Sequence, residues 1–207
     1  MSKFNLELGV YLTPEMHDIY DNSESRVRLF NLLGRVNDKF NDEFDTSFNM
    51  RIIKAPYAQS IPELFVLGKL STSNKSDKKL LDDYVDATRC GKILMDYKQI
   101  FSGDLIDRYK LILINRNGNN HFGNICLGSS DEDEKLAVVN IATNEDLRYR
   151  SILHELSHLF GANDSSIGYG IMGRIEKASD FWSPFTKIKM KRRIKKVCGG
   201  RIKWLKN

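Results

Sequence analysis

One stretch of the chain combines helical and turn spacing with metal-binding side chains: residues 151–164, Ser-Ile-Leu-His-Glu-Leu-Ser-His-Leu-Phe-Gly-Ala-Asn-Asp. His154 and His158 are four residues apart, so on a helix both imidazoles project from one face and can bind one Zn²⁺. Gly161 fits the end of such a helix, because glycine adopts the left-handed conformation without a Cβ penalty. The chain can then turn back and offer Asp164 as a third ligand.

The residue between the histidines gives the predicted site its chemistry. Catalytic zinc sites use three protein ligands and keep one position for water, and Glu155 is placed to take the proton of that water. This is the arrangement of zinc peptidases. If Asp164 were only a surface carboxylate at the helix end, His17 or His121 would have to supply the third ligand, but both are distant from the pattern.

The pattern continues beyond the third ligand. Eight residues after Asp164 comes Met172, in Tyr-Gly-Ile-Met-Gly, residues 169–173. The long motif together with this methionine resembles the metzincin clan of zinc endopeptidases. The resemblance implies that Met172 forms a Met-turn, a hydrophobic floor beneath the metal. Most metzincins have histidine in place of Asp164, whereas the snapalysins resemble this chain in using aspartate.

Within the clan the chain is most similar to the adamalysins, or reprolysins. Their pattern has counterparts to Glu7, Asp107, Gly123-x-x-Cys126, Ser183-Pro184 and Cys198. The resemblance implies a Cys126–Cys198 disulfide, with Cys90 as a buried thiol, and therefore a secreted protein. The alternative is that all three cysteines are reduced core residues of an intracellular zinc peptidase.

A calcium site is a second implication of the adamalysin resemblance. In that family the positions of Glu7, Asp107 and Cys198 help to form the site, and an asparagine completes it. Here Arg201 stands near the place of the asparagine. A cation there opposes Ca²⁺, which prefers oxygen ligands, so the ligand chemistry argues against calcium.

The substrate is expected to lie along an edge strand. Residues 121–128 read as a short strand, and an extended peptide can add to such an edge through main-chain hydrogen bonds. We therefore predict that His121, Phe122 and Gly123 contact the substrate. By resemblance to the clan, Gly173 and Arg174 border the pocket for the side chain after the scissile bond.

Length and periodicity predict the fold. The chain has 207 residues, 41% of them hydrophobic, which suits one compact catalytic domain. It has no apolar run long enough to span a membrane, and no secretory h-region at its start. Alternation and apolar runs predict strands at residues 6–12, 50–54, 109–115, 121–128 and 137–141. Helices are expected at residues 23–44, with Val27, Phe30, Leu33, Val36 and Phe40 facing the sheet, from 80 past 90, and around the histidines. A polar loop is expected at residues 71–78 and an acidic loop at residues 131–134.

This order of elements predicts an α/β protein of the metzincin type. We expect a three-layer sandwich with a mixed, mostly parallel sheet, an antiparallel edge strand and a zinc-binding helix. The N-terminal subdomain would span about residues 1–161. A small C-terminal subdomain, about residues 162–207, would hold the Met-turn and a basic helix. We expect a monomer.

The charge is concentrated at the C-terminus. Residues 187–206 hold ten Lys or Arg and no acid. The rest of the chain therefore has 22 of the 32 basic residues and all 27 acidic residues, which gives it a formal charge of −5. Such a segment could bind anionic partners such as glycans, nucleic acid or a membrane surface. Alternatively, it is the solvated face of a helix that packs through Phe185, Ile188, Ile194 and Val197.

Two functions follow from these observations. The first is a zinc-dependent endopeptidase with Glu155 as general base. The second is a secreted binding protein that keeps a metzincin scaffold and holds anionic partners through its basic helix, with zinc only structural. An intact Glu155 favours the enzyme, because a structural zinc site has no need of a base.

Overall fold

The computed structural model describes residues 3–56, 93–102, 108–114, 128–133, 135–140, 145–165, 170–173 and 179–204. A five-stranded sheet and five helices, four of them labelled, account for most of them. The elements in chain order are β1 (Phe4–Leu12), α1 (Pro14–Ile19), α2 (Ser23–Phe44), β2 (Thr46–Lys54), β3 (Tyr109–Ile114), β4 (Gly128–Asp131), β5 (Leu136–Asn140), α4 (Glu145–Leu159) and α5 (Pro184–Trp204). Residues 93–100 form a further helix. The predicted loop at 71–78 and helical start at 80–90 lie outside the described residues.

The sheet is mixed and mostly parallel, as the sequence predicted. The strand order is β2-β1-β3-β5-β4. The strands β2, β1, β3 and β5 run parallel to one another, and only β4 runs antiparallel, at the edge beside β5. This arrangement places the zinc-helix candidate α4, which follows β5, next to the antiparallel edge, and α4 contacts both β5 and β4.

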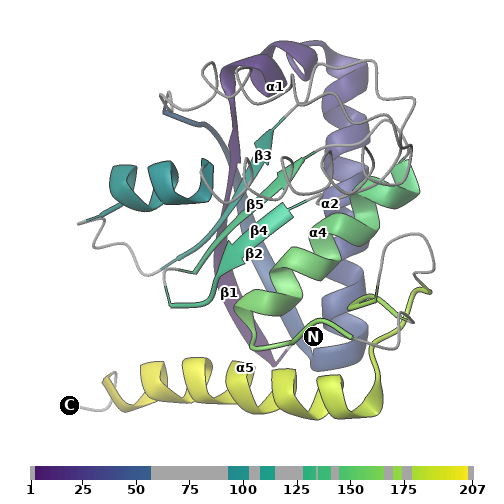
Figure 1. The fold of residues 1–207 in the computed structure, drawn as a ribbon, viewed down its shortest axis with the longest axis vertical. Helices are drawn as coiled ribbons and strands as arrows, with labels where there is room; N and C mark the ends of the chain where they lie inside the picture. Colours follow the sequence, from purple (N-terminus) through teal and green to yellow (C-terminus); the bar gives the residue numbers. More distant parts are fainter. Residues whose placement is uncertain are drawn as a thin grey trace, which may run out of the picture.

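Helices cover both faces of the sheet, which makes three layers (Figure 1). Strand side chains alternate between the faces. Val10, Leu111 and Val139 point to the face that α2 and α4 cover, whereas Ile112 and Val138 point to the helix of residues 93–100. Because both faces are buried, the central strand β3 is apolar at five of its six positions, which suits a parallel sheet covered on both sides.

The buried face of α2 differs from the predicted one. The helix has the predicted bounds, and Asn22 caps it by accepting a hydrogen bond from the amide of Ser25. Val27 and Phe30, however, are exposed, at 57% and 59%. Each step of three residues falls about 60° short of a full helical turn, so repeated steps of three rotate these side chains off the buried face. The buried positions are Leu29, Leu32, Leu33, Val36, Phe40 and Phe44.

The described part of the antiparallel edge strand extends beyond the predicted end at residue 128. It spans Gly128–Asp131, whereas the predicted strand residues 121–127 lie outside the described residues. Asp131 pairs with Leu136, so only four residues remain for the hairpin turn, and Asp131 belongs to the strand rather than to an acidic loop. Lys135 adopts a φ of 53° in that turn. The acids there have cationic partners: Asp131 contacts Lys98 at 2.7 Å and Glu132 contacts Arg193 at 2.7 Å.

The C-terminal helix α5 packs through two of the four expected residues, Ile194 and Val197, whereas Phe185 and Ile188 are exposed. Met190, Ile194 and Cys198 are buried, and Val197 packs against the same core. The structure carries Cys198 as a buried thiol rather than half of a disulfide, so the expected Cys126–Cys198 bridge is not supported. Cys90 and Cys126 lie outside the described residues. Without that bridge the argument for secretion loses its basis, and an extracellular location stays a prediction.

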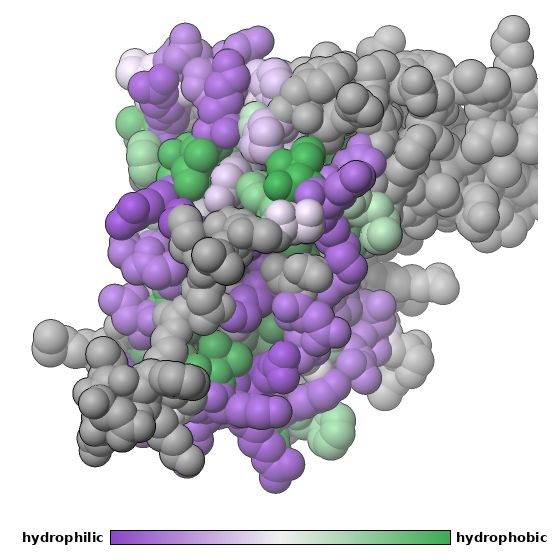
Figure 2. All heavy atoms as spheres, turned by 90° about the vertical axis from the view of Figure 1, so that its left-hand side faces the viewer, coloured by the Kyte–Doolittle hydropathy of each residue, from purple (hydrophilic) through white to green (hydrophobic). Residues whose placement is uncertain are grey.

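The exposed surface is mostly hydrophilic on the side that Figure 2 shows, with separate hydrophobic patches between polar side chains. Among the described residues, no helix has the length and apolar character needed to cross a membrane. The predicted division into subdomains near residue 161 and the monomeric state remain predictions.

Candidate metal centre

The side chains of α4 point either into the hydrophobic core or toward the candidate metal centre. Ile152, Leu153, Leu156 and Leu159 recur at helical spacing and are fully buried against the sheet. The histidines lie on another side of the helix, and their side chains are 15% and 22% exposed. Gly161 follows the helix with a φ of 80°, so the left-handed residue expected there is present.

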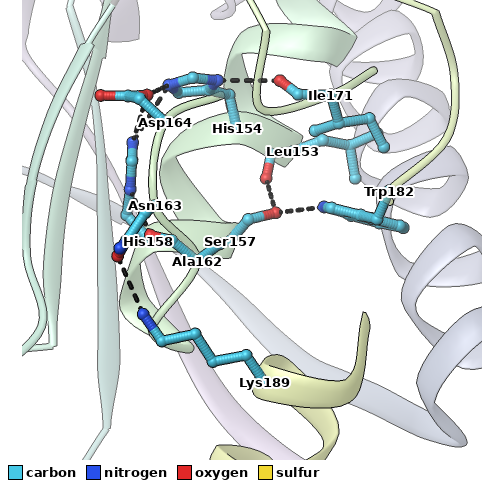
Figure 3. Close-up of polar contacts among 10 residues, drawn as sticks. All are labelled: Leu153, His154, Ser157, His158, Ala162, Asn163, Asp164, Ile171, Trp182 and Lys189. Atoms are coloured by element: carbon cyan, nitrogen blue, oxygen red, sulfur yellow. Dashed lines mark hydrogen bonds and ion pairs between the residues drawn. The ribbon is translucent and has the colours of Figure 1, made fainter. Parts of the chain in front are cut away.

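Three donor atoms meet at one point beside α4 (Figure 3). The Nε2 atoms of His154 and His158 are 3.1 Å apart. The Oδ1 atom of Asp164 lies 3.1 Å from the first and 3.3 Å from the second. The sequence predicted these three side chains as ligands, and among the described residues they form the one group of at least three His, Cys, Asp or Glu side chains that could hold a metal ion. Because Asp164 remains 75% exposed, the centre opens to solvent on that side.

The second nitrogen of each histidine is held by the backbone. His154 donates from Nδ1 to the carbonyl oxygen of Ile171 at 2.9 Å, and His158 donates from Nδ1 to the carbonyl oxygen of Ala162 at 2.8 Å. A carbonyl oxygen can only accept, so the proton of each neutral imidazole sits on Nδ1 and the Nε2 lone pair faces the centre. Outer partners of this kind fix the tautomer and the orientation of metal-ligating histidines.

The spacing of the donors fits zinc. Ligands at about 2.0–2.1 Å in a tetrahedron lie roughly 3.3 Å from one another, and the observed separations are 3.1, 3.1 and 3.3 Å. Two imidazoles and one carboxylate are also a donor set of catalytic zinc sites. The residues present therefore fit a zinc ion with a further position open.

The electrostatics of the centre favour positive charge. Burial lowers the pKa of His154, but the hydrogen bond to Asp164 and the charge of Glu155 outweigh burial, and the net pKa is raised. The same balance raises the pKa of His158. Hydrogen bonds from the two histidines hold the pKa of Asp164 far below its ordinary value. The pKa values of these three side chains shift because a carboxylate lies against two imidazoles. The same negative charge also attracts a metal cation to this point.

Glu155 is buried between α4 and the edge strand β4. Only 6% of this residue is exposed. Burial raises its pKa, whereas the nearby histidines and a hydrogen bond from Ser130 lower it, and the net shift is upward. Space for the side chain exists because residue 128 is glycine: a Cβ at Gly128 would lie 2.4 Å from Cγ of Glu155. The edge strand thus determines where this carboxylate can lie.

A buried turn supports the centre from below. Met172 is in the main core with 3% exposure, and its carbonyl oxygen accepts from the amide of Ser165 at 2.7 Å. Ile171, whose carbonyl holds His154, donates its own amide to the carbonyl of Phe181 at 2.8 Å. Gly170 adopts a φ of 80°, and a Cβ there would lie 2.6 Å from that same Phe181 oxygen. The turn of residues 170–173 therefore couples His154 to the segment that precedes α5.

A second buried contact joins α4 to the segment that precedes α5. Trp182 donates from Nε1 to the hydroxyl of Ser157 at 2.8 Å, and Ser157 donates to the carbonyl of Leu153 (Figure 3). Lys189 of α5 donates to Asn163 Oδ1 at 2.9 Å, beside the third ligand. These bonds join the helix, the turn back to Asp164 and α5 into one support.

Of the predicted site residues, the structure brings together His154, Glu155, His158 and Asp164, with Met172 in the adjoining turn. Gly173 also lies in that turn. His121, Phe122, Gly123, Cys126, Arg174 and Asp107 lie outside the described residues. His17 is on α1 and does not belong to the metal group. Glu7 accepts a hydrogen bond from Asn49, and calcium binding there is not tested.

Two residues at the site were missed by sequence reasoning. These are Gly128 and Ser130, which shape and hydrogen-bond the surroundings of Glu155. The available signal was weak: a glycine within a strand pattern often marks a close approach of another group. The sequence alone could not show which group approaches it.

Comparisons with known proteins agree with this geometry at the level of the fold. No family model matches the sequence, and a search of curated proteins gives no match. Among solved structures, the chain is similar to archaemetzincin from Methanopyrus kandleri, with 12% identity, a TM-score of 0.56, and coverage of 92% of this chain and 96% of that one. It is also similar to metalloproteinase-II from Bacteroides fragilis, with 13% identity, a TM-score of 0.53, and coverage of 91% of this chain and 53% of that one.

This likeness defines a class of fold. The described architecture is similar to that of these two solved structures, and its histidine-bearing helix lies beside an antiparallel edge strand. Neither neighbour is named as an adamalysin, so the closer resemblance to that family is not supported by these comparisons.

Proposed function

We propose that this chain is a zinc-dependent endopeptidase of the metzincin kind. The observation that supports the proposal most directly is the meeting of His154 Nε2, His158 Nε2 and Asp164 Oδ1 within 3.3 Å of one another. The buried carboxylate of Glu155 lies on the next residue of the same helix. The fold shared with metallopeptidases supports the same conclusion.

Different residues of the chain would bind the metal and transfer the proton. His154, His158 and Asp164 would hold the metal, and bound zinc would supply a Lewis acid that polarises a peptide carbonyl and lowers the pKa of water. Glu155 takes the proton from the attacking water and returns it to the leaving amine. Burial prepares it for this role, since a carboxylate with a raised pKa binds a proton more readily near neutral pH. Met172 forms part of the floor.

The substrate would bind along β4. This strand is the last in the sheet among the described strands, and it runs antiparallel to β5. An extended peptide added to its outer side would lie beside Glu155, because the side chain of that residue sits against Gly128. The contacts of His121, Phe122, Gly123, Gly173 and Arg174 with the peptide remain part of this proposal.

The test combines metal content with cleavage. Elemental analysis should find one zinc per chain, and the protein should cleave an unfolded protein or a peptide library. Glu155→Gln keeps the shape of the side chain but removes the base, so it should retain zinc and lose about 10²–10⁴-fold in kcat. A matched control is Glu145→Gln on the same helix. Its carboxylate is 58% exposed in a surface ion pair with Arg35, so activity should be unchanged.

Two results would reject the proposal. If wild type with stoichiometric zinc cleaves nothing across the library, the alternative of a zinc-stabilised binding protein replaces the enzyme. If Glu155→Gln cleaves as fast as wild type, Glu155 is not the general base and the proposed mechanism is wrong. If elemental analysis finds no stoichiometric zinc, both the zinc peptidase and the zinc-stabilised binding protein are rejected.

A further inference from the structure

The helix α5 presents one long face away from the rest of the protein. It lies along one end of the molecule, with the fold on one side of it (Figure 1). Met190, Ile194 and Cys198 face the core. On the opposite side, residues 185, 188, 192 and 195 follow one another at spacings of three, four and three, so they share a single stripe.

The start of this stripe is apolar and exposed. Phe185 is 77% exposed and Ile188 is 51% exposed, and Phe181, just before the helix, is 47% exposed. Large apolar side chains of this kind gain about 1.5–3 kcal/mol each when they are fully buried, so their exposure here is unfavourable unless another surface covers them. Neither Phe185 nor Ile188 contributes to the proposed metal centre, whereas the carbonyl of Phe181 supports the turn beneath it.

The remainder of the stripe is cationic, since it consists of Arg192 and Lys195, and Lys191 and Lys196 flank it on either side. All four side chains are exposed, and within the described part of the chain none of them forms an ion pair. Other cations of the helix point inward. Lys187 contacts Glu43 at 2.6 Å and Arg193 contacts Glu132 at 2.7 Å.

These inward contacts fix the rotation of α5. With Lys187, Lys189 and Arg193 held by groups of the body, the helix cannot turn its outward cations toward the acidic remainder of the chain. The result is a basic face with apolar side chains at one end, on a protein whose residues outside 187–206 sum to −5. This asymmetry orients the molecule in the field of an anionic surface.

We propose that this outer face of α5, formed by Phe185, Ile188, Lys191, Arg192, Lys195 and Lys196, binds the surface of an anionic lipid membrane. Cations contact the acidic headgroups, and the aromatic and aliphatic side chains insert between them, as in interfacial amphipathic helices. A polyanion such as nucleic acid would satisfy the cations but would leave Phe185 and Ile188 exposed. The membrane is therefore the partner that uses both parts of the face.

The experiment is co-sedimentation of the full chain with vesicles. Vesicles of phosphatidylcholine and phosphatidylserine, in a ratio of roughly 3:1, should bind the protein at low salt, and pure phosphatidylcholine should not. Arg192→Gln with Lys195→Gln should weaken binding by about 25-fold, at about fivefold for each cation. Phe185→Ser with Ile188→Ser should weaken it by at least about tenfold. All four side chains are exposed, so the variants should fold.

A matched control replaces two exposed cations elsewhere. Arg51→Gln with Lys54→Gln on β2 removes the same charge from another face, and should leave vesicle binding unchanged. Equal binding to neutral vesicles, no binding to anionic ones, or an equal loss in the β2 variant would overturn the proposal. Binding that depends on the cations but not on Phe185 and Ile188 would overturn it as well, and would assign the face to a soluble polyanion. Because none of these variants touches the metal centre, cleavage of soluble peptides serves as an independent measurement.

Discussion

Gly128 of β4 leaves the space that the side chain of Glu155 on α4 occupies. A Cβ at residue 128 would lie 2.4 Å from Cγ and 2.6 Å from Cδ of that glutamate, which is closer than real Cβ contacts come. The two residues are 27 positions apart in the sequence, and the pairing of β4 with β5 brings them together. The edge strand therefore sets the position of the proposed general base from across the site.

Gly128→Ala should displace Glu155 and leave the three metal ligands in place. We expect kcat for peptide cleavage to fall by about 10²–10⁴-fold, the usual contribution of a general base, with zinc content unchanged. Gly34→Ala is the matched control, because a Cβ at Gly34 on α2 meets nothing within 4 Å. Its activity should equal that of wild type.

A thermal measurement tests the same contact without any activity assay. Overpacking costs about 1–3 kcal/mol, so Gly128→Ala should lower Tm by roughly 2–10 °C in wild type. In a Glu155→Ala background the colliding Cγ and Cδ are gone, and the same substitution should change Tm little. An equal loss in both backgrounds would show that Glu155 is not the group that the new Cβ meets.

Asp164→Ala should remove the third metal ligand. We expect zinc affinity, measured by competition with a chelating dye, to fall by more than about 100-fold, the upper end of the effect of outer-shell substitutions. Asn163→Ala provides the control, since it changes the neighbouring residue and breaks only the hydrogen bond with Lys189. If both variants bind zinc as wild type does, Asp164 is a surface carboxylate and not a ligand.

Removal of zinc should lower the stability of the wild-type protein. A ligand that binds only the folded state at a free concentration of 100 times Kd stabilises it by about 2.7 kcal/mol. For a chain of this length, this corresponds to a Tm shift of roughly 5–11 °C on addition of a chelator. Asp164→Ala should show little shift under the same conditions. A wild-type Tm that changes with neither zinc nor chelator would contradict a metal centre that stabilises the folded protein.

Ser157→Ala tests the support behind α4. The substitution leaves the buried Nε1 of Trp182 without its acceptor, which should cost about 1–3 kcal/mol and lower Tm by roughly 2–10 °C. Ser151→Ala is closely matched, because this buried serine makes the same bond to the carbonyl four residues earlier, and its hydroxyl makes no second hydrogen bond within the described residues. A Tm loss as large in Ser151→Ala would mean that the Trp182 bond is not the cause.

The sequence by itself determined the parts of the site that lie within one helix and the turn after it. His154, His158, Gly161 and Asp164 are separated by three or four residues, and at this range helical and turn geometry alone fixes which side chains meet. The apolar runs likewise predicted the central strands and the three layers, because burial on both faces requires them.

Only the tertiary structure decided which distant segments meet. The contact of Gly128 and Ser130 with Glu155 depends on the register of β4, and register follows from pairing along the whole edge rather than from any local pattern. The exposure of Phe30 on α2 and of Phe185 on α5 depends on how each helix is rotated against its neighbours. An apolar residue in a helix can face the core or the solvent, and packing against elements far away in the chain makes that choice.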